Sequence, residues 1–369
     1  MKFATNVSIL QTIVGDLSKG VGNDKSLPIT SMLGIECLPN KEVVFTVTDY
    51  ANYLTISLTL DGDDEEYEEG FATVTADMFI KLVQKCKAKD EITFETLDNC
   101  LVVGCGGVYK LELCDDGSGT GDAVHFTSPI GSFPSVGYTE YLLDRKTIDS
   151  MLDSCKQALY PDKAEIYSKY LVADKVVSTD RTRAVFVDSE VAKGKPHIVL
   201  DSRLVDLMTV FSGDATLKVT DDSILVTNAN GIVKIYSKTK SELGGYDENG
   251  LNNMLGMKFP SMCKVNKAEL ISVINKMGLF CTKYEDNALH IDFKDNSMIL
   301  SSIKDAAVEE IEYIESMDVS PFSLYIDITR LLAHLKAYNG DVVTLYFGAP
   351  KCIKLEEDNI VQIIALVAR

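Results

Sequence analysis

The feature that most constrains the fold of this chain is a change from strand-like to helix-like sequence that occurs three times at equal spacing. Helices are predicted to begin near Thr75, Asp201 and Asp327, where alternating residues give way to apolar residues at helical spacing. The separations are 201 − 75 = 126 and 327 − 201 = 126 residues. Thr and Asp favour helix starts because their side-chain oxygens accept hydrogen bonds from free backbone N–H groups. The spacing predicts three similar units, with 369/3 = 123 residues available for each.

A second set of predicted helices supports the repeat. These helices begin at Asn6, Asp144 and Asn266 and carry apolar residues at helical spacing. Asn266 and Glu269 have the spacing of a capping box. The separations, 144 − 6 = 138 and 266 − 144 = 122, are unequal, so we expect the units to differ in loop length.

Between the predicted helices, the sequence alternates between apolar and polar residues and contains turn signals such as "TDD", "NANG" and "KDN". Each unit is therefore predicted to hold two helices and roughly eight short strands, which makes the fold class α+β with helices packed on antiparallel sheets. We expect domains at residues 1–131, 132–256 and 257–369. The alternative is three unrelated α+β domains whose helix starts align by chance.

Composition limits the classes of function. The net charge is −19, so the overall field repels nucleic acid, and any role on DNA needs a local basic surface. The nine Cys are scattered without a CxxC pair, which is typical of free thiols in a reducing compartment. The first residues resemble a strand rather than a secretory leader, and no apolar run approaches the ~20 residues that span a bilayer. We therefore expect a cytoplasmic protein with no membrane partner.

No motif in the sequence indicates catalysis, a metal or a cofactor. The four His have no partner at metal-ligand spacing, and "GSGTGD" lacks the Lys of a phosphate-binding loop. The acidic run "DGDDEEYEEG" does not match a calcium-binding loop, and a solvated hairpin tip explains it better. Two alternatives stay open. One is an enzyme whose site is assembled from distant residues, and the other is a secreted repeat protein, which should show a signal peptide and paired Cys.

Basic residues concentrate on the predicted helices, while the acids gather in loops. This distribution is typical either of ordinary solvated helix faces or of a surface that follows a phosphate backbone by charge alone. The candidate DNA-facing residues are Lys81, Lys85, Lys87, Arg145, Lys146, Lys156, Lys267, Lys276, Arg330 and Lys336.

Four short motifs carry a resemblance to a known family. They are "MKF" at the start, "SLPITSMLGIE" after the first predicted helix, "SFPSV" before the second unit, and "TDRTRA" at residues 179–184. The last is similar to the family's Thr-Asp-Gly-His-Arg-Leu-Ala. In their order along three repeats, these motifs resemble the sliding clamp of bacterial replication, the beta subunit of DNA polymerase III. The chain would be a divergent member of bacterial or phage origin.

The resemblance implies a non-catalytic processivity factor. Three copies of one α+β fold per chain would form a ring as a head-to-tail homodimer, with helices lining a hole around duplex DNA. An acidic exterior and a basic lumen would let the ring slide without sticking. The ring would tether the replicative polymerase. At the dimer interface the resemblance implies Tyr109 and Leu111 on one side and Leu279 and Phe280 on the other, with Glu309, Glu310 and Glu312 as possible partners for Lys110.

The resemblance also implies a groove between the second and third domains, where clamp-binding peptides of the polymerase and the clamp loader dock. Arg183 would donate a charge-assisted hydrogen bond to the peptide. The weaker copy of the motif, "TVTDYANY", lies in the first unit, where the family has no such groove. Arg181-Thr182 replaces the family's Gly-His and Ala365-Leu366 its Met-Pro, so different peptides are expected. The groove positions are Tyr167, Thr179, Arg181, Thr182, Arg183, Ala184, Pro350, Cys352, Ile363, Ile364, Ala365, Leu366 and Val367.

Overall fold

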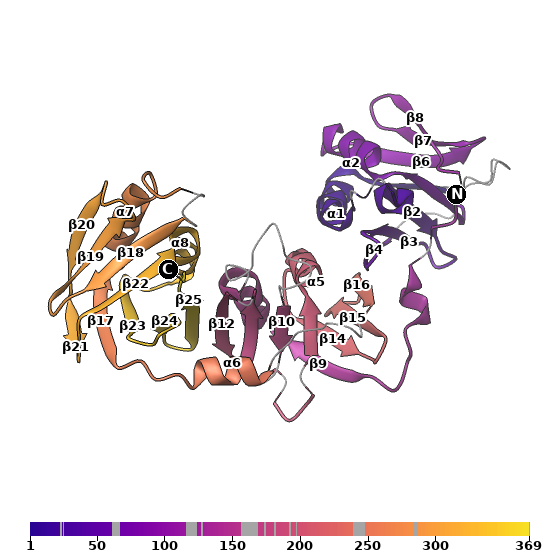
Figure 1. Cartoon of the computed structure of the whole chain (residues 1–369). Coiled ribbons are helices and arrows are strands. Elements are labelled where there is room, and N and C mark those ends of the chain that lie inside the picture. Colours follow the sequence, from indigo (N-terminus) through magenta and orange to yellow (C-terminus); the bar gives the residue numbers. More distant parts are fainter. Residues whose placement is uncertain are drawn as a thin grey trace. The chain divides into compact units, whose positions relative to one another are not determined.

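The structure is a computed structural model of the whole chain (Figure 1). It describes residues 1–369 except 23, 25, 61–66, 116–123, 127, 156–168, 173–174, 181, 192, 197, 239–247, 283–286 and 369. The described chain divides into two compact units. The first contains Met1–Arg145 and Asp206–Glu242, and the second contains Lys146–Val205 and Leu243–Arg369. The middle of the chain contributes strands to both units, and the domain limits at 131/132 and 256/257 stay a prediction.

The first unit contains two antiparallel sheets and two long helices, α1 (Val7–Gly20) and α2 (Ala76–Lys85). The smaller sheet has the order β1-β6-β7-β8, and the larger has the order β5-β2-β3-β4-β16-β15-β14-β9. The strands are β1 (Lys2–Asn6), β2 (Met32–Cys37), β3 (Glu42–Thr48), β4 (Asn52–Thr59), β5 (Gly70–Thr75), β6 (Glu91–Leu97), β7 (Cys100–Gly104), β8 (Val108–Glu112), β9 (Thr139–Leu143), β14 (Ala215–Val219), β15 (Ser223–Asn228) and β16 (Val233–Lys238).

The second unit also contains two antiparallel sheets. Their orders are β13-β10-β11-β12-β25-β24-β23-β17-β21 and β20-β19-β18-β22. The strands are β10 (Lys169–Val172), β11 (Lys175–Thr179), β12 (Arg183–Asp188), β13 (Ile198–Asp201), β17 (Ser261–Asn266), β18 (Ala288–Phe293), β19 (Ser297–Ser302), β20 (Val308–Glu312), β21 (Glu315–Met317), β22 (Phe322–Asp327), β23 (Val342–Phe347), β24 (Cys352–Glu357) and β25 (Ile360–Ala365).

The helices of the second unit include α6 (Glu248–Leu255), α7 (Lys267–Met277) and α8 (Ile328–Ala337). Two short helices, α3 (Arg145–Asp149) and α5 (Ser202–Leu207), fall at the limits of the units, and α5 continues into the 3-10 turn η6 (Met208–Val210). Another 3-10 turn, η3 (Pro129–Ser132), precedes β9. None of the helices within the described ranges is long and apolar enough to cross a membrane.

Asn6, Asp201, Asn266 and Asp327 accept backbone hydrogen bonds at the helix starts, as predicted. The Asn6 side chain accepts from the Ser8 N–H at 2.8 Å, and the Asn266 side chain accepts from the Glu269 N–H at 3.0 Å. Thr75 directly precedes α2, but its side chain makes no capping hydrogen bond to that helix. The Thr75 hydroxyl instead interacts with the thiol of Cys114, so tertiary contact replaces the local cap.

The apolar stripes of the long helices form the cores of the units. Leu10, Val14 and Leu17 of α1 are fully buried, which explains their helical spacing in the sequence. In the second unit, Ile274 of α7 and Leu335 of α8 lie in one cluster with residues of both sheets. The predicted α+β class, with helices packed on antiparallel sheets, is confirmed.

Candidate functional site

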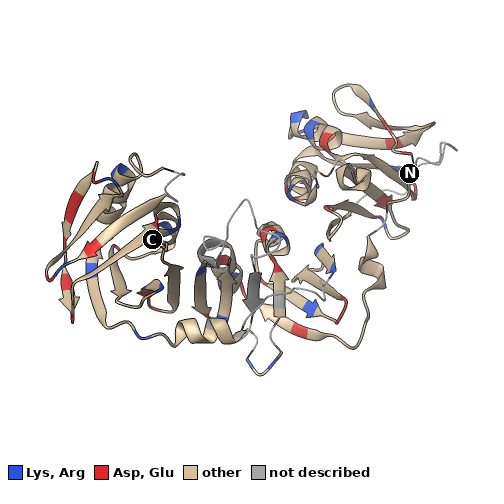
Figure 2. Ribbon diagram, viewed as in Figure 1, with Lys and Arg blue, Asp and Glu red and all other residues tan. Residues whose placement is uncertain are grey.

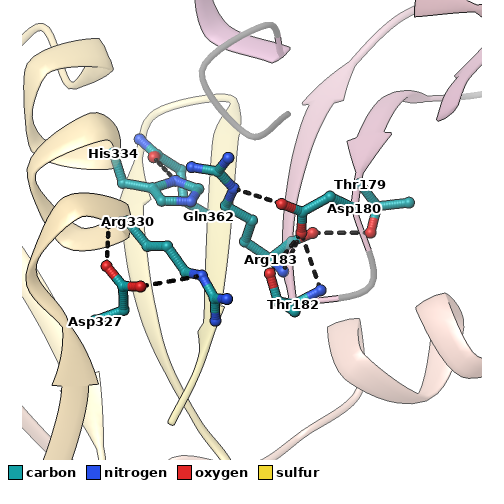
Figure 3. A network of polar contacts seen from close by, with 8 residues as sticks. All are labelled: Thr179, Asp180, Thr182, Arg183, Asp327, Arg330, His334 and Gln362. Carbon is teal, nitrogen blue, oxygen red and sulfur yellow. Dashed lines mark hydrogen bonds and ion pairs between the residues drawn. The ribbon is translucent and has the colours of Figure 1, made fainter. Parts of the chain in front are cut away.

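Four described residues of the Thr-Asp-Arg-Thr-Arg cluster, Thr179, Asp180, Thr182 and Arg183, lie where β11 ends and β12 begins. One oxygen of the Asp180 carboxylate accepts from the Thr182 N–H at 3.0 Å, the Thr182 hydroxyl at 2.7 Å and the Arg183 N–H at 3.1 Å. The other oxygen accepts from Arg183 Nε at 3.0 Å (Figure 3). The side chains of Asp180 and Arg183 are only 4% and 5% exposed. These contacts therefore stabilise the hairpin itself, and Arg183 Nε donates to Asp180 within the chain.

The C-terminal strand lies beside this hairpin. Strand β25 pairs with β12 so that Ile364 lies opposite Arg183 and Ile363 opposite Ala184. The pairing continues beyond the start of β12, because the Ala365 N–H donates to the Thr182 carbonyl at 2.8 Å. The Leu366 N–H donates to the Lys351 carbonyl and the Val367 N–H to the Tyr325 carbonyl, both at 2.8 Å. Backbone hydrogen bonds to three separate segments of the chain thus hold the apolar tail in place.

The predicted groove residues are divided between two faces of this sheet, because residues on a strand alternate in direction. On one face, Ala184, Cys352 and Ile363 form a buried cluster with Val177 and Phe186. On the other face, Ile364 belongs to the core that contains α8. Tyr167 and Arg181 lie outside the described residues.

Residues that the sequence reasoning missed cover the first of these faces. Met254 and Leu255 of α6, together with Phe259, pack against the cluster of Ala184, Cys352 and Ile363. The Cys352 thiol lies 3.3 Å from the sulfur of Met257, which is 36% exposed. A signal was present in the sequence, because Phe-Pro-Ser occurs at residues 133–135 and again at 259–261, a separation of 126 residues.

The exposed part of this region is therefore its rim. Thr182, Ala365, Leu366 and Val367 are half-buried and Pro350 is exposed, whereas Ala184 and Ile363 have no exposed surface. An apolar surface edged by a few polar groups suits a short hydrophobic peptide. Met254, Leu255, Met257 and Phe259 form what we call the methionine-rich cover. Any ligand on this face would contact the rim and this cover first.

A buried histidine lies on the opposite face. His334 of α8 is completely buried, and its Nδ1 hydrogen-bonds the Gln362 side chain on β25 (Figure 3). Its Nε2 has no hydrogen-bond partner within the described part of the chain. The pKa of His334 is lowered from 6.5 to about 4, mainly by burial; the nearby Arg183 charge also lowers it, while the Gln362 hydrogen bond and the Asp180 charge raise it.

This histidine should make the fold sensitive to acid. The unfolded state takes up the His334 proton at a higher pH than the folded state, so stability is lost as pH falls from about 6.5 toward 4. Between pH 7.5 and pH 4.5, wild type should lose about 2–3 kcal/mol more unfolding free energy than His334→Gln, whose side chain does not titrate. Chemical unfolding followed by circular dichroism at the two pH values measures the difference. Equal losses in the two proteins would contradict the prediction.

The predicted DNA-facing residues fall into two groups. Basic residues colour the ribbon of α2 blue in Figure 2. Those with partners in the chain are Lys81 with Asp77 at 2.8 Å, Lys276 with Glu309 at 2.8 Å, Arg330 with Asp327 at 3.7 Å, Lys267 with the Tyr338 carbonyl, and Arg145 with the Phe211 carbonyl. Those exposed and without an ion pair to another described residue are Lys85, Lys87, Lys146 and Lys336. Lys156 lies outside the described residues.

The predicted interface residues lie at sheet edges or beside them. Strands β8 and β20 are the edge strands of their four-stranded sheets. Tyr109 on β8 is 45% exposed, but Leu111 is buried within the chain. Leu279 and Phe280 follow α7 and are 82% and 47% exposed.

Two of the three acidic residues proposed as partners for Lys110 already make contacts within the chain. Glu309 pairs with Lys276, and Glu310 accepts from the Ser297 hydroxyl at 2.5 Å. Glu312 is exposed and has no such contact to a described residue, so it is the best remaining partner for Lys110.

Comparison with known proteins finds strong similarity in fold but little similarity in sequence. No family model and no curated protein matches the chain. A DNA polymerase sliding clamp from Bacillus subtilis has a TM-score of 0.81 at 16% identity and covers 100% of this chain and 99% of its own. This chain has the sliding-clamp fold. A putative DNA polymerase III beta subunit from Eubacterium rectale has a TM-score of 0.81 at 18% identity, with both chains covered completely. A Helicobacter pylori beta clamp bound to a DNA ligase peptide has a TM-score of 0.77 at 16% identity, again with complete coverage.

The comparison confirms the resemblance seen in the sequence at the level of fold. The likeness extends over the whole chain, so the similarity in fold is not limited to one segment. The low identity agrees with the expectation of a divergent chain.

Proposed function

We propose that this chain is a DNA sliding clamp that encircles duplex DNA and tethers a replicative polymerase without catalysing a reaction itself. The observation that carries the proposal is the sliding-clamp fold over the full length of the chain. The exposed lysines on helices and the net charge of −19 support it, because a basic lumen within an acidic protein holds DNA by phosphate contacts alone. The clamp would act in the cytoplasm, with three domains divided near residues 131 and 256.

The ring requires two copies of the chain, joined head to tail. Strand β8 of one copy would pair with β20 of the other, which would cover two edges that otherwise invite aggregation. Tyr109, Leu279 and Phe280 would supply apolar contact, and Lys110 would pair with Glu312. Light scattering at micromolar concentration should give a mass of twice 40.6 kDa. A chain that stays monomeric would argue against the ring.

Helix α2 should contribute to the DNA-facing surface. Lys81 and Lys85 are exposed and one turn apart, and the exposed pair of Lys81 with Asp77 has little energetic value. The double variant Lys81→Glu/Lys85→Glu should fold normally but be found on closed circular DNA in several-fold smaller amount, because repulsion from the phosphates hinders its loading. Retention is measured by gel filtration of loaded DNA at moderate salt.

The matched control for this variant places the same charge change in hairpin turns. Lys294→Glu/Lys304→Glu alters two exposed lysines next to β18, β19 and β20. The control should be retained like wild type. If the two double variants behave alike, the effect is one of net charge and α2 does not face DNA.

The rim beside β25 is the proposed docking site for clamp-binding peptides of the polymerase and the clamp loader. The apolar cluster, the anchored tail and the methionine-rich cover support this assignment. The Helicobacter pylori clamp of the same fold is bound to a ligase peptide, which shows that such folds can hold peptides. The contacts proposed here are Thr182, Met257, Pro350 and residues 365–367.

A further inference from the structure

The chain contains two copies of one hairpin turn, and their hydrogen bonds correspond. In the turn between β3 and β4, the Thr48 hydroxyl donates to the Asn52 carbonyl at 2.7 Å, and the Asn52 N–H donates to the Asp49 carboxylate at 2.8 Å. In the turn between β11 and β12, the Thr179 hydroxyl donates to the Arg183 carbonyl at 2.8 Å. The Arg183 N–H donates to Asp180 at 3.1 Å. Asn52 and Arg183 are therefore equivalent positions.

Each turn leads into an equivalent strand pair. Strand β4 pairs with β16 over five residue pairs, and β12 pairs with β25 over five residue pairs. Past each pair, one more hydrogen bond follows the same scheme: the Lys238 N–H donates to the Ala51 carbonyl at 3.3 Å, and the Ala365 N–H donates to the Thr182 carbonyl at 2.8 Å. We call the β4–β16 pair the first junction and the β12–β25 pair the second junction.

The buried side chains at the two junctions differ in polarity. Ile235 lies opposite Leu54 at the first junction, and Gln362 lies opposite Val185 in the same place at the second. His334 is seven residues past the helix-capping Asp327, and Met208 is seven residues past Asp201, which accepts from the Arg203 N–H at the start of α5. Ile235, Met208 and His334 have no exposed surface, and Gln362 is 2% exposed.

This difference has an energetic consequence. At the second junction, the ion pair of Asp180 and Arg183 is almost fully buried, and His334 Nε2 makes no hydrogen bond to any described residue. Buried ion pairs often contribute less stability than apolar residues of similar size, and each unsatisfied buried polar atom is costly. The first junction has one such atom, the Asn52 side-chain oxygen, and its other buried polar side chains, Thr55 and Ser237, are neutral hydroxyls with hydrogen-bond partners. Because the backbone pairing is the same, the side chains should decide which junction opens more easily.

We infer that the second junction opens locally at a lower free energy than the first, and that the His334–Gln362 pair sets the difference. Opening would release the tail strand and the hairpin that carry the proposed docking rim. The strand pair beside that rim is therefore a conformational device, whereas its counterpart at the first junction is a fixed support. The inference concerns the free chain and holds whether or not the chain slides on DNA.

Hydrogen exchange of the unliganded chain, followed by mass spectrometry, tests this inference. Peptides that cover β12 and β25 should exchange at least ~10-fold faster than those that cover β4 and β16. The variant His334→Met/Gln362→Ile gives the second junction the residues of the first, and it should slow exchange in β12 and β25 without changing β4 and β16. Equal exchange at the two junctions in wild type, or no slowing in the variant, would overturn the inference.

The reciprocal variant Met208→His/Ile235→Gln is the matched control. It gives the first junction the polar residues of the second, and it should speed exchange in β4 and β16 toward the rate of β12 and β25. If the variant exchanges faster across the whole chain, exchange at the junctions occurs through global unfolding, and the inference of local opening is wrong. Because no DNA or partner is present, failure here would leave the sliding-clamp proposal untouched.

Discussion

Replacing Asp180 with Ala is expected to lower the free energy of unfolding by about 3–5 kcal/mol. The carboxylate accepts four hydrogen bonds from Thr182 and Arg183, and both members of the Asp180–Arg183 pair are almost fully buried. Removing the acid leaves the guanidinium buried without its charged partner, which costs more than the pair itself contributes. The turn would also lose the acceptor that fixes its backbone. Denaturant unfolding followed by circular dichroism suits this chain, which has no Trp.

The equivalent turn of the first unit supplies the control for Asp180→Ala. Asp49 holds the same position, but it bonds the neutral Asn52 in place of an arginine. Asp49→Ala should therefore cost only about 1–2 kcal/mol, the range for lost turn hydrogen bonds without an isolated buried charge. If the two variants lose the same amount of stability, the buried charge of Arg183 is not what makes Asp180 important.

Removal of residues 365–369 should abolish peptide binding and leave the dimer intact. The truncation keeps the β25 pairs up to Ile364 but deletes the three backbone hydrogen bonds made by Ala365, Leu366 and Val367. It also removes most of the rim on which a peptide would lie. Affinity for the clamp-binding peptide of the cognate polymerase, measured by fluorescence anisotropy, should fall by at least ~100-fold, since several apolar contacts of about 1 kcal/mol each are lost together.

Two measurements accompany the truncation. Removal of Arg369 alone is the control and should leave the affinity unchanged. Light scattering of the truncated chain should still give the mass of the dimer, because none of the proposed interface residues lies in the tail. Unchanged peptide affinity in the truncated dimer would place the docking site elsewhere on the chain.

The sequence was sufficient for the architecture because periodic patterns determine it. The helix starts at Asn6, Asn266 and Asp327 have local caps, and all three occur in the structure. The place of the tail beside the turn that follows Thr179 was implied by the family resemblance, and the structure has this pairing. Helix caps depend on residues close in sequence, and strands show their alternation of apolar and polar residues one by one.

The partners of individual side chains could not be predicted in the same way. The pairing of Arg183 with Asp180, three residues earlier, was not predicted, because it depends on a turn that brings the two groups together in a buried place. The ion pair of Lys276 with Glu309, on a strand of the adjoining sheet, was likewise not predicted. Helix α6 was missed because a short segment rich in Asn and Gly has weak helical propensity, and its apolar residues become buried only by contact with β12, β24 and β25.

The central claim, that two copies of this chain close around DNA, is tested most directly by threading. The chain is incubated with linear duplex that carries biotin at both ends, streptavidin is added to block the ends, and the mixture is filtered through a gel at high salt. The account predicts that the chain elutes with blocked DNA and separates from DNA whose ends stay free, because salt removes phosphate contacts but cannot release a closed ring. Equal retention on blocked and free DNA, or loss from both, would contradict encirclement.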